Sequence, residues 1–264
     1  MPFSHCGTLI PRIGDEQVVA AAWTRFLQHQ SVQVGGVRSV VLHSWQRCRS
    51  EAVNPESSCA PAVDHERVRQ LLAEHRELCD AARPVLDGLR DILRECGSLI
   101  MLTDPGGTIL DLNGESRVRS AGEGVNLAMG GCWNEELIGT NAIGTAIATG
   151  VPVQIHASEH FCVDVKRWTC AAAPILDPLG RNLLGVVDVS GVKETFHGHS
   201  LALVMAAAKQ IEGELARRDG ILHARLLARA MDDFIRYGND CLMLCDPRGR
   251  VVRTSGSVQA AREH

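Results

Sequence analysis

Three copies of the tetrapeptide Asp-Pro-x-Gly constrain the fold of this chain more than any other feature. They begin at Asp104, Asp177 and Asp246. Aspartate at the first position, proline at the second and glycine at the fourth favour a type I β-turn. The first copy lies between two short apolar runs, Leu99–Thr103 and Thr108–Leu112. Each copy therefore predicts a β-hairpin, and we expect mainly antiparallel sheet in the chain from residue 98 onward.

The first and third hairpins also share the residues that precede the turn. Leu99–Thr103 reads Leu-Ile-Met-Leu-Thr, and Cys241–Cys245 reads Cys-Leu-Met-Leu-Cys. The chain has 264 residues, which is long for one domain, and the third copy of the turn stands near its end. We therefore expect two sheet domains in tandem, of which the second has barely begun.

The first third of the chain has helical periodicity instead. Behind Asp64, a candidate N-cap, apolar residues recur at Val68, Leu71 and Leu78, the spacing of one helix face. Pro84 stands inside the continuing pattern, so either a new helix starts there or the helix kinks.

A second helical stretch follows the first sheet. Residues 196–238 contain no proline, and we expect most of them to form one helix. Leu215 and Leu222 are seven residues apart, a spacing typical of the seam between paired helices. The sequence therefore predicts a homodimer joined along this helix, and the alternative is a helix that packs only on its own domain.

The composition excludes several classes of protein. The longest apolar run, Leu201–Ala208, is far shorter than the roughly 20 residues of a membrane span, and residues 1–16 do not resemble a secretory signal. The basic residues are scattered among 31 acidic ones, and aromatic residues make up 4%, so direct nucleic-acid binding is not expected. We expect a cytoplasmic protein whose ten cysteines are reduced thiols.

Small residues are concentrated between Gly130 and Ala146. Glycines there allow the backbone to approach another backbone or a ligand closely. No Gly-Lys-Ser/Thr sequence follows them, so the segment is not a phosphate-binding loop, and ATP hydrolysis is not expected.

Six short pieces, in this order along the chain, resemble the N-terminal sensor region of the acetoin catabolism regulator family of sigma-54-dependent transcriptional activators. The pieces are Ser44-Trp45-x-Arg47-Cys48, Trp133-x-Glu135, Gly139-Thr140-Asn141-Ala142-Ile143-Gly144-Thr145, Glu159-His160-Phe161, Trp168-Thr169-Cys170-Ala171-Ala172 and Asp188-x-Ser190-Gly191. The resemblance covers residues 40 to 255.

The resemblance implies an α/β (α+β) fold built on a GAF-type antiparallel sheet flanked by helices. It implies an N-terminal helical segment at 1–87, a GAF sensor domain at 88–198, a signalling helix at 199–238 and the start of a PAS-like domain at 239–264. Members of the family continue into an ATPase and a DNA-binding domain, whereas this chain ends at His264. We therefore expect a sensor fragment that neither hydrolyses ATP nor binds promoter DNA.

Five residues within the matched pieces are candidate ligand contacts: Trp133, Asn141, His160, Trp168 and Cys170. Apolar walls with a few polar groups are typical of a small-molecule pocket. The family implies a short oxygenated effector such as acetoin, which would bias the packing of the signalling helix. The alternatives are that both tryptophans are ordinary core residues and that His160 is a satisfied structural histidine.

Other chemistries remain as alternatives at neighbouring residues. His156, His160, Cys162 and Cys170 are of metal-ligand types, but no C-x-x-C pair accompanies them, and we expect no metal or cofactor. A thiol-based redox sensor or a GAF-type methionine sulfoxide reductase would use cysteines such as Cys132, yet no cysteine combines a basic neighbour with a C-x-x-C partner, so we expect no catalysis. Asp188, in an apolar strand, is either exposed at a strand end or edge or a ligand contact.

Overall fold

The structure is a computed structural model that describes residues 16–28, 36–179, 182–195, 197–237 and 240–255. Contacts between residues divide the chain into two compact units, 1–212 and 213–264. The division falls inside the last helix, so the first unit contains the five-stranded sheet and the second contains a short hairpin.

The first unit consists of seven helices and five strands among its described residues, together with the first turns of an eighth helix. The helices are α1 (Glu16–Leu27), α2 (Ser39–Ser50), α3 (His65–Glu74), α4 (Arg76–Glu95), α5 (Ser116–Glu123), α6 (Glu135–Ile138) and α7 (Ala142–Thr149). The strands are β1 (Ser98–Thr103), β2 (Ile109–Gly114), β3 (Val153–His156), β4 (Trp168–Leu176) and β5 (Leu183–Val192). Three short 3-10 helices cover Ala157–Glu159, Val163–Val165 and Lys193–Thr195.

The five strands form one antiparallel sheet in the order β2-β1-β5-β4-β3. The β1–β2 hairpin turns at Asp104, whose carbonyl accepts the Gly107 N–H at 3.1 Å and whose side chain accepts the Thr108 N–H at 2.8 Å. Gly107 has a φ of +84°, which favours glycine. β4 and β5 are joined at Asp177. These two hairpins are confirmed, although Gly180 lies outside the described residues.

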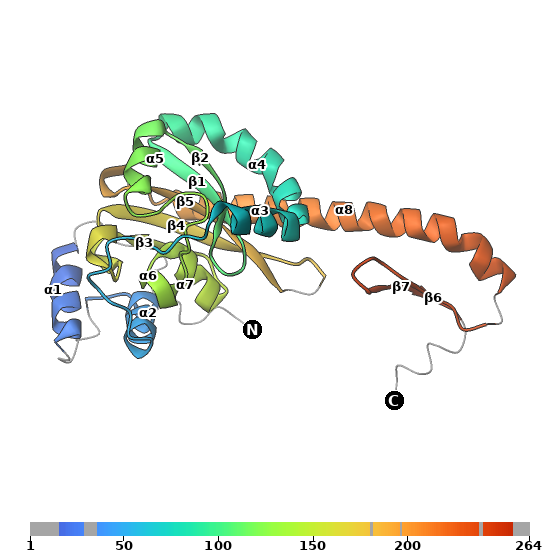
Figure 1. The fold of residues 1–264 in the computed structure, drawn as a ribbon, viewed down its shortest axis with the longest axis horizontal. Helices are drawn as coiled ribbons and strands as arrows, with labels where there is room; N and C mark the ends of the chain where they lie inside the picture. Colours follow the sequence, from blue (N-terminus) through green and yellow to red (C-terminus); the bar gives the residue numbers. More distant parts are fainter. Residues whose placement is uncertain (1–15, 29–35, 180–181, 196, 238–239, 256–264) are drawn as a thin grey trace. The chain divides into compact units, whose positions relative to one another are not determined.

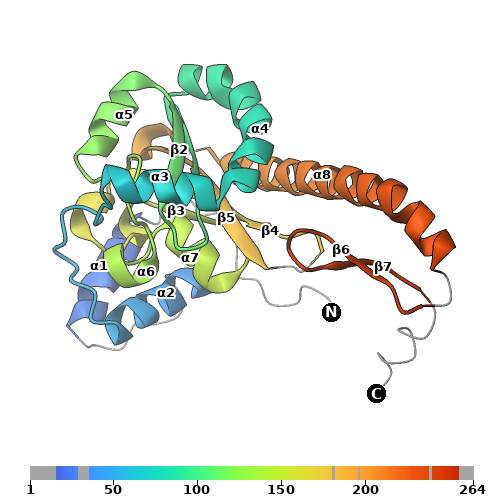
Figure 2. The same cartoon turned by 45° about the vertical axis from the view of Figure 1, so that its right-hand side comes forward.

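Helices cover both faces of the sheet. α7 packs on β3, β4 and β5 on the face that carries Met101, Ala172 and Asp188, which lie side by side in the register of the central strands. α4 packs on the other face, where Leu78 approaches Gly185 of β5. Figures 1 and 2 show α4 on the opposite side of the sheet from α6 and α7. The predicted antiparallel sheet flanked by helices is therefore confirmed.

The N-terminal helices differ from the prediction at one boundary. Asp64 caps α3 as predicted, because its side chain accepts the Arg67 N–H at 2.8 Å. The next helix begins at Arg76 rather than at Pro84, and α4 continues through the proline. A proline inside a helix removes one hydrogen bond, but α4 buries apolar residues on both sides of it, including Leu78 and Leu86, which compensates for that loss.

The long helix predicted after the sheet is α8 (Ser200–Arg236), which has 37 residues. In the second unit it is followed by a hairpin of β6 (Met243–Cys245) and β7 (Val251–Thr254). The third predicted turn is confirmed, because the Gly249 N–H donates to the Asp246 carbonyl at 2.9 Å. The PAS-like domain implied for this region stays a prediction. Within the described residues, no helix is long and apolar enough to cross a membrane.

Candidate functional site

Four of the five candidate ligand contacts line one internal cavity between α7 and the sheet. The cavity offers about 10 Å³ to a water-sized sphere, which is room for one water molecule. It is lined by Leu127, Trp133, Asn141, Ala142, Ile143, Val165, Trp168, Cys170, Asp188 and Ser190. The wall is mostly apolar, and the polar groups come from β4, β5 and the start of α7.

The two tryptophans in the wall differ in how their indole N–H groups are used. Trp133 is buried, and its Nε1 donates to the Asn126 carbonyl at 3.0 Å. Trp168 is also buried, but its Nε1 has no hydrogen-bond partner. Trp133 therefore has the bonding of an ordinary core residue, whereas Trp168, which also lines the cavity, has a buried donor without a partner.

Asn141 is the N-cap of α7, and this role uses both ends of its side chain. Its Oδ1 accepts the Gly144 N–H at 2.9 Å, and its Nδ2 donates to the Gly139 carbonyl at 2.8 Å. Asparagine is a favoured N-cap because its oxygen satisfies one of the free N–H groups of the first turn. Asn141 therefore fixes the end of α7 that closes the cavity.

His160 does not line this cavity. The ring is fully buried, and its Nδ1 lies 3.0 Å from the Ala157 carbonyl. Burial lowers the pKa of His160 to about 3, so the imidazole is neutral, and Nδ1 donates to the carbonyl. Its Nε2 is buried without a hydrogen-bond partner, so the ring is not fully satisfied, and a ligand contact by His160 stays a prediction.

Asp188 lies at the centre of the sheet rather than at a strand end. β5 pairs with β1 on one side and β4 on the other, so the Asp188 side chain has no exposed surface. The Ser190 hydroxyl donates to Oδ1 at 2.5 Å, while Oδ2 has no partner. Burial raises the pKa of Asp188 to about 7. The alternative of a solvent-exposed position at a strand end or edge is wrong.

The cysteines near the cavity are protonated thiols. Burial raises the pKa of Cys162 to about 12 and the pKa of Cys170 well above its usual value. A reactive cysteine needs the opposite shift, because the thiolate is the nucleophile. Among the residues that the structure describes, no group of three or more His, Cys, Asp or Glu side chains is arranged to hold a metal ion.

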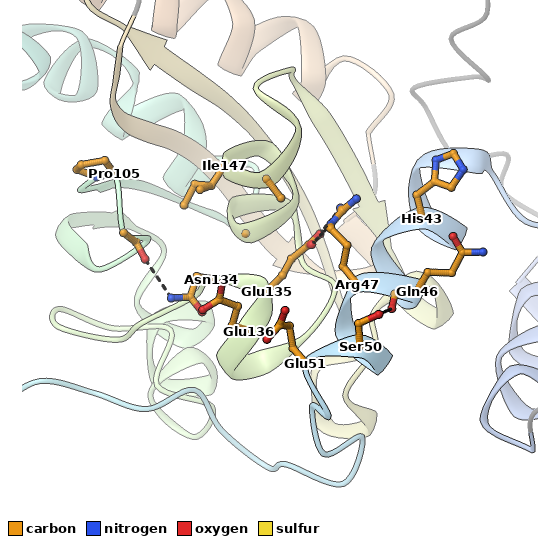
Figure 3. Close-up of a pocket in the computed structure, with 13 residues that line it drawn as sticks. His43, Gln46, Arg47, Ser50, Glu51, Pro105, Asn134, Glu135, Glu136 and Ile147 are labelled. Carbon is orange, nitrogen blue, oxygen red and sulfur yellow. Dashed lines mark hydrogen bonds and ion pairs between the residues drawn. The ribbon is translucent and has the colours of Figure 1, made fainter.

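A larger hollow of about 560 Å³ lies at the surface between α2, α6, α7 and the β1–β2 turn. Figure 3 shows Arg47 and Glu135 directed toward each other beside it. The hollow is lined by His43, Gln46, Arg47, Ser50, Glu51, Pro105, Gly106, Asn134, Glu135, Glu136, Gly144, Ile147 and Ala148.

Glu135 is the centre of a buried hydrogen-bond network under this hollow. Its carboxylate accepts hydroxyl protons from Ser44 at 2.5 Å and Thr145 at 2.6 Å. The Arg47 Nε donates to its second oxygen at 2.6 Å. Burial raises the pKa of Glu135, but the hydrogen bonds from Arg47, Ser44 and Thr145 outweigh this effect and hold the pKa below its usual value. The network ties α2 to α6 and α7.

A second ion pair attaches the N-terminal helices to the segment after β3. The Arg38 Nε donates to Glu159 Oε1 at 2.7 Å, and the Trp45 Nε1 donates to the Glu159 carbonyl at 2.8 Å. The Trp23 Nε1 donates to the Phe161 carbonyl at 3.1 Å.

These structural roles explain several of the short sequence pieces that the cavity does not. Ser44 and Arg47 come from one piece and Glu135 from another, and they meet in the network. From the sequence alone, only the residue pattern within each piece marks these residues. That Ser44 and Arg47 contact Glu135 becomes visible only in the folded chain.

The comparisons with known proteins agree with the resemblance. The chain is 33% identical over 241 residues to the acetoin dehydrogenase operon transcriptional activator AcoR of Bacillus subtilis, covering 90% of the chain and 39% of the relative. It is 31% identical to the propane 2-monooxygenase operon transcriptional activator MimR of Mycolicibacterium smegmatis, covering 83% of the chain and 37% of the relative. The chain thus spans about two fifths of the length of these relatives.

A solved structure shows the same fold. The chain is similar to a chain of the crystal structure of the Escherichia coli DhaR(N)–DhaL complex, with a TM-score of 0.71 and 19% identity. The match covers 84% of this chain and 76% of that chain. The family described as MimR, N-terminal domain, matches residues 16–213. The predicted kinship with the acetoin regulators is confirmed, and the chain belongs to the family of MimR N-terminal domains.

Proposed function

We propose that this chain is the effector-sensing region of a transcriptional activator and that it binds a small, uncharged, oxygenated metabolite of the acetoin type. The cavity between α7 and the sheet carries the proposal, because Trp133, Asn141, Trp168 and Cys170 line it together. The printed names of the relatives, which include an activator of an acetoin dehydrogenase operon, support the chemical class of the effector.

Binding would require the cavity to expand. In the structure the cavity has room for one water molecule, whereas acetoin has four carbon atoms and two oxygens. Its wall includes the first residues of α7 and Val165 of a 3-10 helix, so expansion would move these elements away from the sheet. The effector would thus favour an open arrangement over the closed one, which is the differential binding that a sensor needs.

The β4 strand offers a direct route from the cavity to α8. Trp168 stands at its beginning, and at its end the Leu176 N–H donates to the Glu212 carboxylate of α8 at 3.0 Å. A displacement of β4 by the effector would therefore alter the packing of α8. Leu215 is already buried within its own chain, whereas Leu222 is partly exposed. We therefore include in the proposal a homodimer joined along the part of α8 that carries Leu222, so that a change in α8 packing would alter the dimer.

The proposal places the protein in the cytoplasm, with the effector as its small-molecule partner and with no direct contact between this region and DNA. The protonated state of Cys162 and Cys170 favours this function over a redox sensor or a reductase, because neither thiol is activated.

Isothermal titration calorimetry of the chain with acetoin tests the proposal. Two equivalent substitutions in α7 form a matched pair, since Ala142 lines the cavity and Ala148 lines the surface hollow. We expect saturable binding to the wild type and to Ala148→Val. In Ala142→Val the added methyl groups occupy the cavity and should weaken binding by about 10-fold or more. Absence of binding to the wild type, or equal binding to both variants, would refute the proposal.

A further inference from the structure

Two residues that line the cavity beneath α7 carry buried polar atoms that the protein itself leaves without hydrogen-bond partners. They are Nε1 of Trp168 and Oδ2 of Asp188, on side chains with 1% and 0% of their surface exposed. Native proteins rarely leave buried polar atoms unpaired, and two in one cavity indicate an occupant that completes them.

The strand register explains why both residues line the same cavity. Cys170 of β4 lies directly opposite Ser190 of β5. Trp168 and Asp188 lie two residues from this pair in opposite directions along the strands, since Trp168 is opposite Val192 and Asp188 is opposite Ala172. All four side chains lie on the face of the sheet that α7 covers. The Ser190 hydroxyl bonds to Oδ1 of Asp188 and leaves Oδ2 available to an occupant.

The two atoms require different properties of the occupant. An indole N–H only donates, so the occupant must offer an acceptor to Trp168. At pH 8, above its pKa of about 7, the Asp188 carboxylate is mainly ionised and only accepts, so the occupant must then offer it a proton. A hydroxyl group can supply the proton that Asp188 accepts, and the oxygen of a hydroxyl or carbonyl group can accept from Trp168, whereas a ketone has no donor and an ammonium group has no acceptor.

The charges of the residues that line the cavity further restrict which ligands can bind there. Among the described residues that line it, none is lysine, arginine or histidine, and Asp188 is the one acid. An anionic ligand such as a carboxylate or phosphate would find no counter-charge and would face the aspartate. The apolar side chains of Leu127, Ile143 and Val165 suit a short hydrocarbon portion.

We infer that Trp168 and Asp188 determine specificity by binding the oxygen atoms of an uncharged short-chain alcohol or hydroxyketone effector, whose hydroxyl group donates to Asp188. The inference rests on the proposed function and adds to it the group that is recognised and the residues that recognise it.

Calorimetry at pH 8 with 2-butanol and butanone tests the inference, because the two compounds differ in whether the oxygen carries a proton. We expect the wild type to prefer 2-butanol by about 10-fold or more, since a site with a buried acceptor rejects a ligand that leaves it unpaired. Asp188→Asn can direct an amide N–H at the cavity, and the preference should disappear. Trp168→Phe removes the donor and should weaken the binding of both compounds.

Thr169→Val is the matched control. Thr169 lies between Trp168 and Cys170, is buried with an unpaired hydroxyl, and faces the opposite side of β4. The Thr169→Val variant should bind 2-butanol and butanone as the wild type does.

The outcomes separate the inference from the proposed function. If the wild type binds neither these compounds nor acetoin, the proposed function fails and the inference fails with it. If the wild type binds acetoin but does not distinguish 2-butanol from butanone, or if Asp188→Asn keeps the preference, the inference is overturned while the proposed function stands. In that second case, Trp168 and Asp188 hold a structural water only.

Discussion

Asp188→Asn should change the stability of the chain by an amount that depends on pH. Asp188 is fully buried at the centre of the sheet, and its pKa of about 7 lies above the ordinary value of 3.8 that it regains on unfolding. Between these two values the folded chain binds one more proton than the unfolded chain at this residue. The free energy of unfolding therefore falls as pH rises through this window and does not fall further above it.

The magnitude follows from the two pKa values. Each pH unit within the window corresponds to about 1.4 kcal/mol, so the whole interval corresponds to about 4 kcal/mol. The part between pH 5 and pH 7 is worth about 3 kcal/mol. The amide of the Asp188→Asn variant does not ionise and therefore escapes this loss. The variant should gain about 3 kcal/mol relative to the wild type between pH 5 and pH 8.

Urea unfolding followed by tryptophan fluorescence at pH 5, 6, 7 and 8 measures this difference. Glu123→Gln is the control, since Glu123 is an exposed carboxylate at the end of α5. Its stability difference from the wild type should be nearly constant over the same range. A constant difference for Asp188→Asn as well would refute the reasoning, because it would mean that Asp188 ionises alike in the folded and unfolded chains.

Three further changes have expected outcomes. Gly144→Ala should destabilise the chain by about 1–3 kcal/mol in urea unfolding, because the added carbon would lie 2.6 Å from a backbone nitrogen. Gly213→Ala meets open space in α8 and should stabilise the chain by about 0.5–1 kcal/mol in the same assay. Arg47→Met should cost about 1–3 kcal/mol in the same assay, since it removes a donor from the buried Glu135 carboxylate. Leu222→Asp should convert the proposed dimer to monomer in sedimentation velocity; a wild-type monomer at tens of micromolar would refute the pairing.

Local chemistry explains which parts of the fold are predictable from sequence. The turn at Asp104 depends on four consecutive residues, and the cap at Asp64 on a contact three residues away, so both are visible in the sequence. The helix boundary at Arg76 is not, because the pattern continues across it and the packing of α4 overrides the disruptive effect of Pro84.

The candidate site could not be predicted from local sequence, because its residues come from segments far apart in the chain. Asp188 reads as a strand residue, but its burial depends on the strand order, which places β5 between β1 and β4. The contact of Ser44 with Glu135 joins residues 91 positions apart. The sequence pieces therefore indicate which residues matter, while the fold determines that Glu135 is structural and that Trp168 shares a cavity with Asp188.

Hydrogen exchange measured by mass spectrometry, with and without saturating acetoin, tests most directly whether an effector bound beneath α7 acts on α8. The account predicts slower exchange in residues 142–149 and 168–176, which border the cavity, together with a change in residues 200–212 of α8. Unchanged exchange throughout these segments, or protection confined to residues 43–51 beside the surface hollow, would contradict it.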